Sequence, residues 1–202
     1  MTQNTKPTED LRVRRTRKLL MQALIDLTIE KGFSTLTVQD IADRAMINRA
    51  TFYRHYLDKY DLLDKYMTEV YELTAAQESL LSSKTKDVDG ADAPSGMVSM
   101  FEHVQRHADF YRAMLGAQGD PTFAQRIRHY SELRLRSLLP DGAKSKSNSL
   151  PLELCLNYLS HAGVGVISWW LTEGQSYSPE QVAVWLNQLN KANIDLALEL
   201  VR

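Results

Sequence analysis

Residues 37–63, which read TVQDIADRAMINRATFYRHYLDKYDLL, constrain the fold of this chain more than any other segment. Thr37 suits a helix N-cap and Asp40 follows three residues later, which predicts a capping box with Asp in the usual place of Glu. Apolar residues then repeat with helical spacing at Val38, Ile41, Ala42 and Ala45. After a short turn, Asn48 suits the N-cap of a second helix over residues 49–56. The segment therefore predicts two short helices joined by a tight turn.

The second helix of this segment has two chemically different faces. Ile47, Phe52 and Tyr56 share the apolar face, which is expected to anchor the helix. The other face carries basic, hydroxyl-bearing and small residues, namely Arg49, Ala50, Thr51, Tyr53 and Arg54. Arg can read guanine edges, hydroxyl groups can donate to phosphate, and Ala permits close approach to a thymine methyl. This layout is typical of a helix-turn-helix, whose second helix enters the major groove of double-stranded DNA.

The distribution of charge also favours a DNA partner, although the net charge of −1 alone argues against one. Residues 1–60 contain 11 Lys and Arg against 7 Asp and Glu, whereas the remainder contains 13 basic residues against 18 acidic ones. The run RVRRTRK at residues 12–18 could contact phosphates, and Lys59 could reach another phosphate near the free N–H groups of the next helix. The alternative is a solvated helix surface that carries Arg and Tyr, and the combined features favour DNA binding over it.

Residues 14–63, about a quarter of the chain, resemble the N-terminal domain of the tetracycline-repressor (TetR) family of bacterial transcription regulators. The matching residues are Gly32, Phe33, Thr37, Val38, Ile41, Ala42, Ala45, Thr51, Phe52, Tyr53, His55, Tyr56, Lys59, Leu62 and Leu63. The resemblance implies DNA-contacting or contact-supporting roles for Thr51, Tyr53, His55 and Lys59. The family usually has Gly in the turn where this chain has Met46, so a left-handed backbone there would cost about 1–2 kcal/mol.

The rest of the chain is also predicted to be helical, because nearly every apolar run has the helical period and none alternates as a strand does. We expect a disordered arm at 1–11, a three-helix DNA-binding domain at 12–58 and a helical ligand-binding and dimerisation domain at 59–202. The last of these roles is implied by the family resemblance. Helices beyond the DNA-binding segment are expected from Asp58 toward Leu80 and over 97–107, 109–115, 121–139, 150–172 and 179–201.

The last two predicted helices carry more apolar surface than two terminal helices can easily bury within one subunit. Gly163 and Gly165 would allow a partner helix to approach closely. We therefore expect a two-fold homodimer, with two helices from each subunit at the interface. The candidate interface residues are Trp169, Trp170, Val182, Trp185 and Leu189. The alternative is that these residues belong to the core of a single subunit.

Aromatic residues, Met and His in the middle helices suggest a small-molecule pocket. The candidate lining residues are Phe101, His103, Val104, His107, Tyr111, Met114, Tyr130 and His161. Such side chains suit an adaptable pocket for an apolar or aromatic effector, or for a cation attracted to ring faces. An anionic effector would need Arg106 or Arg112, and both are expected to face solvent. Each aromatic could instead be an ordinary core residue.

Metal and cofactor sites are not expected. His103 and His107 are four residues apart, but no carboxylate or Cys completes a metal-binding set, so two solvated histidines are the better interpretation. The single cysteine, Cys155, excludes an intramolecular disulfide framework and is expected to be a small buried hydrophobe. An enzyme using His107 and Tyr111 is a weak alternative, because the sequence shows no nucleophile–base spacing and no Gly-rich phosphate loop.

No targeting or membrane segment is apparent. The first ten residues, MTQNTKPTED, lack an apolar run, and the apolar stretch at 150–171 is interrupted by Glu153, Asn157 and His161. We therefore expect a cytoplasmic chain that does not enter the membrane.

Together these features predict a sequence-specific DNA-binding transcriptional regulator, a homodimeric and ligand-responsive repressor. The alternative is a ligand-independent DNA-binding adaptor or nucleoid-type protein. A cavity of small-molecule size in the C-terminal domain would favour the first interpretation.

Overall fold

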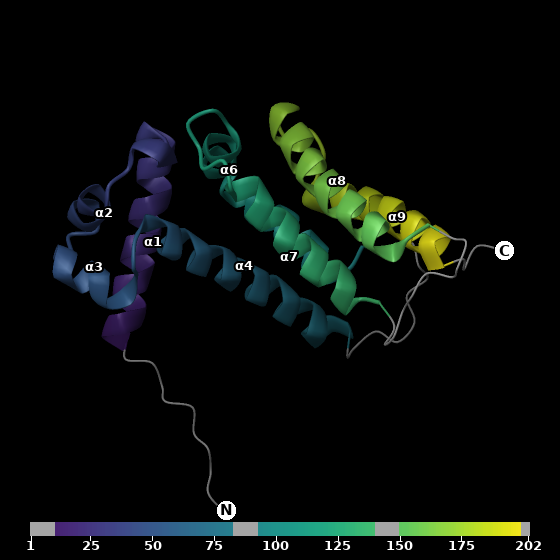
Figure 1. Cartoon of the computed structure of the whole chain (residues 1–202), viewed down its shortest axis with the longest axis horizontal. Helices are drawn as coiled ribbons and strands as arrows, with labels where there is room; N and C mark the ends of the chain where they lie inside the picture. The colour runs from purple at the N-terminus through teal and green to yellow at the C-terminus, as the bar shows by residue number, and fades with distance from the viewer. Residues whose placement is uncertain (1–10, 83–92, 140–149, 199–202) are drawn as a thin grey trace, which may run out of the picture.

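The computed structural model describes residues 11–82, 93–139 and 150–198, and within these ranges the chain forms helices and no strands (Figure 1). One end of the molecule contains α1 (Leu11–Lys31), the short 3₁₀ turn η1 (Phe33–Thr35), α2 (Val38–Arg44) and α3 (Arg49–His55). The middle contains α4 (Lys59–Ser82), α5 (Ser95–Arg106), α6 (Ala108–Leu115) and α7 (Phe123–Ser137). The other end contains α8 (Leu152–Thr172) and α9 (Pro179–Leu198). The all-α prediction, with a helix-turn-helix before a helical C-terminal domain, is confirmed.

The caps that begin α2 and α3 are those predicted from the sequence. The Thr37 side chain accepts a hydrogen bond from the Asp40 N–H at 3.1 Å, and the Asp40 carboxylate accepts one from the Thr37 N–H at 2.9 Å. These bonds to the ionised carboxylate lower the pKa of Asp40 to about 2. Asn48 Oδ1 accepts from the Ala50 N–H at 2.7 Å and caps α3.

The turn between α2 and α3 places Met46 in the left-handed region, with φ of 54°. The Ile47 N–H donates to the Ala42 carbonyl at 2.9 Å, and the Met46 N–H donates to the Asp43 carbonyl at 3.0 Å. This pair of bonds is a Schellman motif, whose left-handed residue is usually Gly. The backbone strain expected at Met46 is therefore present, and the side chain is 90% exposed, so no packing contact offsets it.

One apolar core runs through both ends of the molecule. It extends from Leu20 and Leu24 of α1, through Phe110 of α6, to Trp170 of α8 and Leu186 of α9. The predicted domain boundary at residue 58 remains a prediction, because the first turns of α4 bury Leu62 and Leu63 in this same core. A displacement in the middle helices can therefore reach the helix-turn-helix through contiguous packing.

A second, smaller cluster joins α7, α8 and α9. It contains Cys155, which is buried and whose thiol donates to the Asn193 carbonyl at 3.4 Å. Burial raises the pKa of this thiol, so Cys155 is an unreactive core residue, as predicted. None of the helices in the described ranges combines the length and the apolar character that crossing a membrane requires.

Candidate DNA-binding surface and ligand cavity

Helix α3 is fixed to the domain by one face and exposes the other. Phe52 is fully buried and Tyr56 is buried beside it, as the sequence predicted. The opposite side of α3 exposes Arg49, Ala50, Tyr53 and Arg54, and Thr51 is half-buried. The structure thus brings the predicted base-reading residues together on one solvent-facing surface.

Two side-chain pairs organise this exposed surface. An Arg49 guanidinium N–H donates to the Tyr53 hydroxyl at 3.0 Å, and the guanidinium carbon lies 5.4 Å from the centre of the Tyr53 ring. An Arg54 N–H donates to the Thr51 hydroxyl at 3.1 Å. Because exposed pairs of this kind are weak, base edges and phosphates can replace these partners at little cost.

Lys59 does not face a phosphate, and the predicted phosphate contact is wrong. Its Nζ is buried and donates to the carbonyls of Phe33, Ser34 and Leu36 at 2.8, 3.1 and 2.8 Å. The carbonyls of the η1 turn point inward and need a donor, which Lys59 supplies. Burial lowers the pKa of Lys59, and the nearby Asp120 carboxylate opposes that shift. Lys59 therefore connects α4 to the helix-turn-helix, which is a contact-supporting position.

The other predicted DNA-facing groups lie at the edges of this surface. His55 is the half-buried last residue of α3, and its carbonyl accepts a bond from Lys65 Nζ at 3.1 Å. In the basic run at the start of α1, Arg14, Arg15 and Lys18 are exposed. These three cations are therefore accessible to a phosphate strand.

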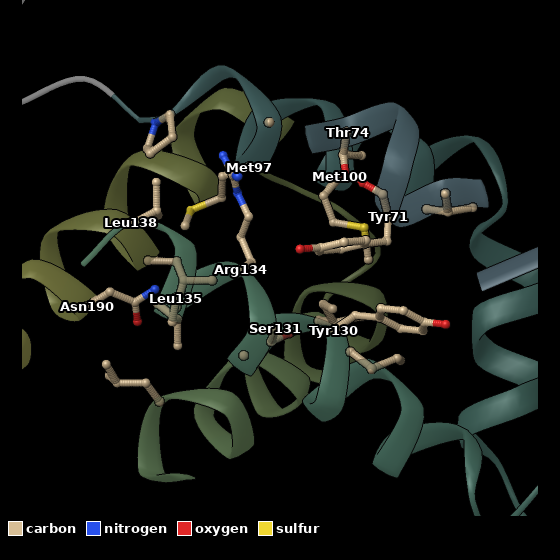
Figure 2. A pocket seen from close by; sticks show the side chains of 18 of the residues that line it. Tyr71, Thr74, Met97, Met100, Tyr130, Ser131, Arg134, Leu135, Leu138 and Asn190 are labelled. Atoms are coloured by element: carbon tan, nitrogen blue, oxygen red, sulfur yellow. Dashed lines mark hydrogen bonds between the residues drawn. The ribbon is translucent and has the colours of Figure 1, made fainter. Parts of the chain in front are cut away.

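A cavity of about 130 Å³ lies among α4, α5, α7, α8 and α9 (Figure 2). Its described lining residues are Met67, Val70, Tyr71, Thr74, Pro94, Gly96, Met97, Met100, Ile127, Tyr130, Ser131, Arg134, Leu135, Leu138, Leu159, Gly163, Ile167, Leu186 and Asn190. Most of these side chains are apolar, and one of the eight predicted pocket residues, Tyr130, is among them. The Tyr130 hydroxyl pairs with the Thr68 hydroxyl at 2.7 Å, and its ring lies 5.3 Å from that of Tyr71.

Most of the remaining pocket predictions are wrong, because the residues fill the solid core beside the cavity. Phe101, Val104, Tyr111 and Met114 are all buried and do not line the cavity. Phe101, for example, packs edge-on against Trp170 with ring centres 5.4 Å apart.

His161 was also predicted to line the pocket, but it is exposed on α8. Its Nδ1 pairs with the Asn157 carbonyl at 2.8 Å, one turn earlier on the same helix. The side chain therefore belongs to the surface of α8 and not to the cavity.

His103 and His107 are neither pocket residues nor a pair of solvated side chains. His103 is largely buried, its Nε2 pairs with the Tyr66 hydroxyl at 2.9 Å, and its ring lies 4.6 Å from that of His107. Burial lowers the pKa of His103 to about 3, with a smaller contribution from His107, and burial also lowers the pKa of His107. Both rings are therefore neutral near pH 7. In the described part of the chain, no group of three or more His, Cys, Asp or Glu residues is arranged to hold a metal ion.

Sequence reasoning missed the polar residues of the cavity, above all Tyr71, Arg134 and Asn190. The available signal was the helical face of α7 that carries Ile127 and Tyr130. Ser131, Arg134 and Leu138 continue that face at helical spacing, and all of them line the cavity.

The predicted dimer residues divide into two groups. Trp170 and Val182 are buried within the subunit, and the Trp170 indole N–H donates to the Tyr177 carbonyl at 3.0 Å. These two cannot form an interface, and that part of the prediction is wrong. Trp169, Trp185 and Leu189 are 42%, 41% and 58% exposed. The two exposed indoles both contact the Tyr177 ring, with ring centres 5.9 and 5.0 Å apart.

The loop between α6 and α7 contacts the helix-turn-helix directly. The Gln118 carbonyl accepts bonds from the N–H and the hydroxyl of Ser34 at 3.2 and 3.3 Å. Gly32 has φ of 79°, and a Cβ there would lie 2.7 Å from the Gln118 Cβ, so both its conformation and the close approach require Gly. The loop that leads into α7 therefore contacts the same η1 turn that binds Lys59.

Comparisons with known proteins agree with this architecture. Residues 20–66 match the family model described as bacterial regulatory proteins, tetR family, and residues 92–192 match the model described as transcriptional regulator C-terminal region. The chain is similar to the HTH-type transcriptional regulator YdeS of Bacillus subtilis, with 29% identity over 101 residues, which are 50% of this chain and 44% of that protein. It spans less than half the length of the curated relatives that it matches.

Solved structures show the same fold at low sequence identity. A TetR transcriptional regulator from Streptococcus agalactiae has a TM-score of 0.59 and 23% identity over 89% of this chain and 95% of that one. SmeT of Stenotrophomonas maltophilia in complex with triclosan has a TM-score of 0.56 and 17% identity over 88% of this chain and 90% of that one. The two family models together span the helix-turn-helix and the helical domain that follows it. The chain belongs to the TetR family of bacterial transcriptional regulators.

Proposed function

We infer that this chain is a sequence-specific DNA-binding repressor that acts as a homodimer and releases DNA when a small molecule enters its cavity. Residues 12–58 serve as the DNA-binding domain and residues 59–202 as the ligand-binding and dimerisation domain. The observation that carries the DNA-binding role is the exposed face of α3, with two guanidinium groups above a buried Phe52 anchor.

Each residue on the exposed face of α3 has a distinct role on DNA. Arg49 and Arg54 read guanine edges in the major groove, and Thr51 and Tyr53 donate to phosphate oxygens. Ala50 permits close approach or contacts a thymine methyl. The exposed cations at 12–18 contact an adjacent phosphate strand, while His55 and Lys59 support the position of α3.

Dimerisation uses the exposed apolar face of α8 and α9. Leu154, Tyr158 and Trp169 share one face of α8 at helical spacing, and all are 42–59% exposed. On α9, Trp185, Leu189 and Leu196 likewise share one face and are 41–58% exposed. Gly165 lies on the α8 face with open space around it, so a partner helix can approach there. A second copy of the chain covers this surface by two-fold symmetry and presents two α3 helices to two half-sites.

The cavity supports ligand response over the ligand-independent alternative. It is bounded by α4, whose first residue, Lys59, binds the η1 turn, and by α7, whose leading loop contacts Ser34 of that turn. SmeT, which has this fold, has been solved in complex with triclosan, a small molecule. Release of DNA requires only that the ligand favour a separation of the two α3 helices that DNA disfavours.

The test begins by selecting DNA from a random pool with the full chain and measuring its affinity by fluorescence anisotropy. The selected duplex should bind at least about 10³-fold more tightly than a scrambled one. Arg49→Ala should weaken this binding by about 1–3 kcal/mol. Arg106→Ala, which changes an exposed Arg of α5, serves as the matched control and should bind as wild type does. If no sequence is enriched, or if both variants bind equally, the proposed DNA-reading role of α3 is wrong.

Ligand response is tested separately on the selected duplex. A mixed metabolite and drug set is screened by thermal shift, because a ligand of the folded state raises the melting temperature. At least one stabilising compound should also weaken the DNA complex. If compounds stabilise the protein and none changes its DNA affinity, the ligand-responsive part of the proposal is wrong and the ligand-independent alternative is favoured.

A further inference from the structure

The cavity has one charged residue among its described lining residues, and that residue is Arg134 of α7. Figure 2 shows its side chain running past Met97, with the Tyr71 hydroxyl directed toward it. The described lining includes no Asp or Glu, so the charge contributed by this wall is positive. We propose that the effector is an apolar monocarboxylate whose carboxylate binds Arg134, an inference that rests on the proposed role of the cavity as an effector site.

The chemistry of guanidinium favours this class of ligand. Arg remains protonated at physiological pH, and its planar fork matches the two oxygens of a carboxylate. Burial lowers the pKa of Arg134, because the charged form loses solvation there. A bound anion offsets that loss, whereas an amine meets a like charge. The charge preference expected from the sequence alone, for a neutral or cationic effector, is therefore reversed.

The size of the cavity limits the apolar part of the ligand. An engineered dry cavity of about 150 Å³ in another protein binds benzene, so about 130 Å³ suits one ring or a short alkyl chain. Met67, Met97 and Met100 line the wall and can adjust their rotamers to ring or chain. Hence the body of the acid is small and apolar, with either an aromatic or an aliphatic skeleton.

Asn190 independently indicates that the cavity is built for a ligand. It lines the cavity from α9, it is 7% exposed, and its Oδ1 has no hydrogen-bond partner. A buried acceptor without a donor costs about 1–3 kcal/mol, and a hydroxyl or N–H of a ligand would remove that cost. Acids that carry such a donor should therefore bind more tightly than the plain acid.

The experiment measures direct binding to the full chain by isothermal titration calorimetry, without DNA. The probes are phenylacetate, 2-phenylethanol and 2-phenylethylamine, which differ mainly in the charge at one end, together with hexanoate as the aliphatic acid. Phenylacetate should bind at least about tenfold more tightly than the alcohol or the amine, as expected for a carboxylate paired with a desolvated guanidinium. Comparison with hexanoate then distinguishes an aromatic from an aliphatic body.

Variants assign the preference to the residue. Arg134→Met should remove the tenfold advantage of phenylacetate and leave binding of 2-phenylethanol unchanged, whereas Arg134→Lys should keep part of it. Arg106→Met is the matched control and should bind all probes as wild type does. If circular dichroism shows that Arg134→Met is unfolded, Arg134→Gln takes its place with the same expectation. In wild type, 4-hydroxyphenylacetate should bind more tightly than phenylacetate, and Asn190→Leu should remove that gain.

Several outcomes would overturn the inference: none of the acids binds, the alcohol or the amine binds as tightly as phenylacetate, or Arg134→Met retains the acid preference. Operator release is measured in a separate assay, so failures can be told apart. An acid that binds through Arg134 and leaves DNA affinity unchanged supports the ligand class and contradicts ligand response. Release by a neutral compound with no binding of acids supports ligand response and overturns the ligand class.

Discussion

The helix-turn-helix and the cavity each hold a partly buried cation, and the two cations are placed differently. Lys59 donates to three backbone carbonyls of the chain itself and is part of the architecture. Arg134 lines an apolar space with no carboxylate among the described lining residues. The comparison teaches that burial of a charge does not identify a binding site. What matters is whether the charge serves the protein's own backbone or lines a space that another molecule can fill.

The largest expected effect distinguishes these two cations by stability. Lys59→Met leaves three inward-facing carbonyls without their donor and should lower the free energy of unfolding by about 3 kcal/mol or more. Arg134→Met replaces a charge in an apolar wall and should change it by less than about 1 kcal/mol, or raise it. Urea denaturation followed by circular dichroism measures both. Equal destabilisation by the two substitutions would remove the distinction between an architectural and a ligand-binding cation.

A second contrast lies between exposed and buried aromatic residues of the last two helices. Trp185→Glu places a charge on the proposed dimer surface and should raise the dimer dissociation constant by about 100-fold, as expected for a central interface Trp. Sedimentation velocity measures the change. Leu73→Glu changes a 64% exposed apolar residue of α4 and should leave the dimer intact. A Trp185→Glu variant that remains dimeric would contradict the assignment of this surface.

The pH dependence of stability tests the buried histidines between the two regions. The pKa of His103 is about 3 in the folded protein and about 6.5 when unfolded, so the unfolded chain binds more protons between these values. Stability should therefore be full above pH 6.5 and fall as the pH is lowered, by about 2 kcal/mol at pH 4.5. Melting temperatures across this range measure it. His103→Gln should flatten the dependence, and an unchanged slope in His103→Gln would show that other groups cause it.

The smallest expected effect concerns the strained turn of the helix-turn-helix. Met46→Gly should stabilise the protein by about 1 kcal/mol, because Gly adopts the left-handed backbone without a Cβ clash. Met46→Ala keeps the Cβ and serves as the control, with no comparable gain. Thermal denaturation distinguishes the two variants. A gain for Ala equal to that for Gly would assign the effect to the exposed Met side chain and not to backbone strain.

How much the sequence could predict differs between the two regions for a physical reason. The caps at Thr37 and Asn48, the position of the turn and the two faces of α3 depend on residues within one or two helical turns. Local spacing is enough to predict them. The cavity is enclosed by five helices, so which face of each helix lines it depends on tertiary packing. Phe101 and Tyr111 have the composition of pocket residues, and packing places them in the core instead.

Two further errors have similar causes. Lys59 looked like a phosphate ligand because its three carbonyl acceptors belong to residues 33–36, about 25 positions earlier in the chain. Trp169 and Trp170 were treated alike, although adjacent helical residues point about 100° apart and cannot share one face. Helical periodicity could have separated this pair, whereas nothing local could have predicted the burial of Lys59.

The most direct test of the account is a comparison of the DNA sequences selected by wild type and by Arg54→Ala from the same random pool. The account predicts that wild type selects an inverted repeat, with half-sites separated by about 34–36 Å or a multiple of that distance. Arg54→Ala should select the same repeat with relaxed preference at one base pair in each half, at symmetry-related positions. A selected sequence without two-fold symmetry, or an identical preference at every base pair for both proteins, would contradict the proposal that each subunit reads one half-site with α3.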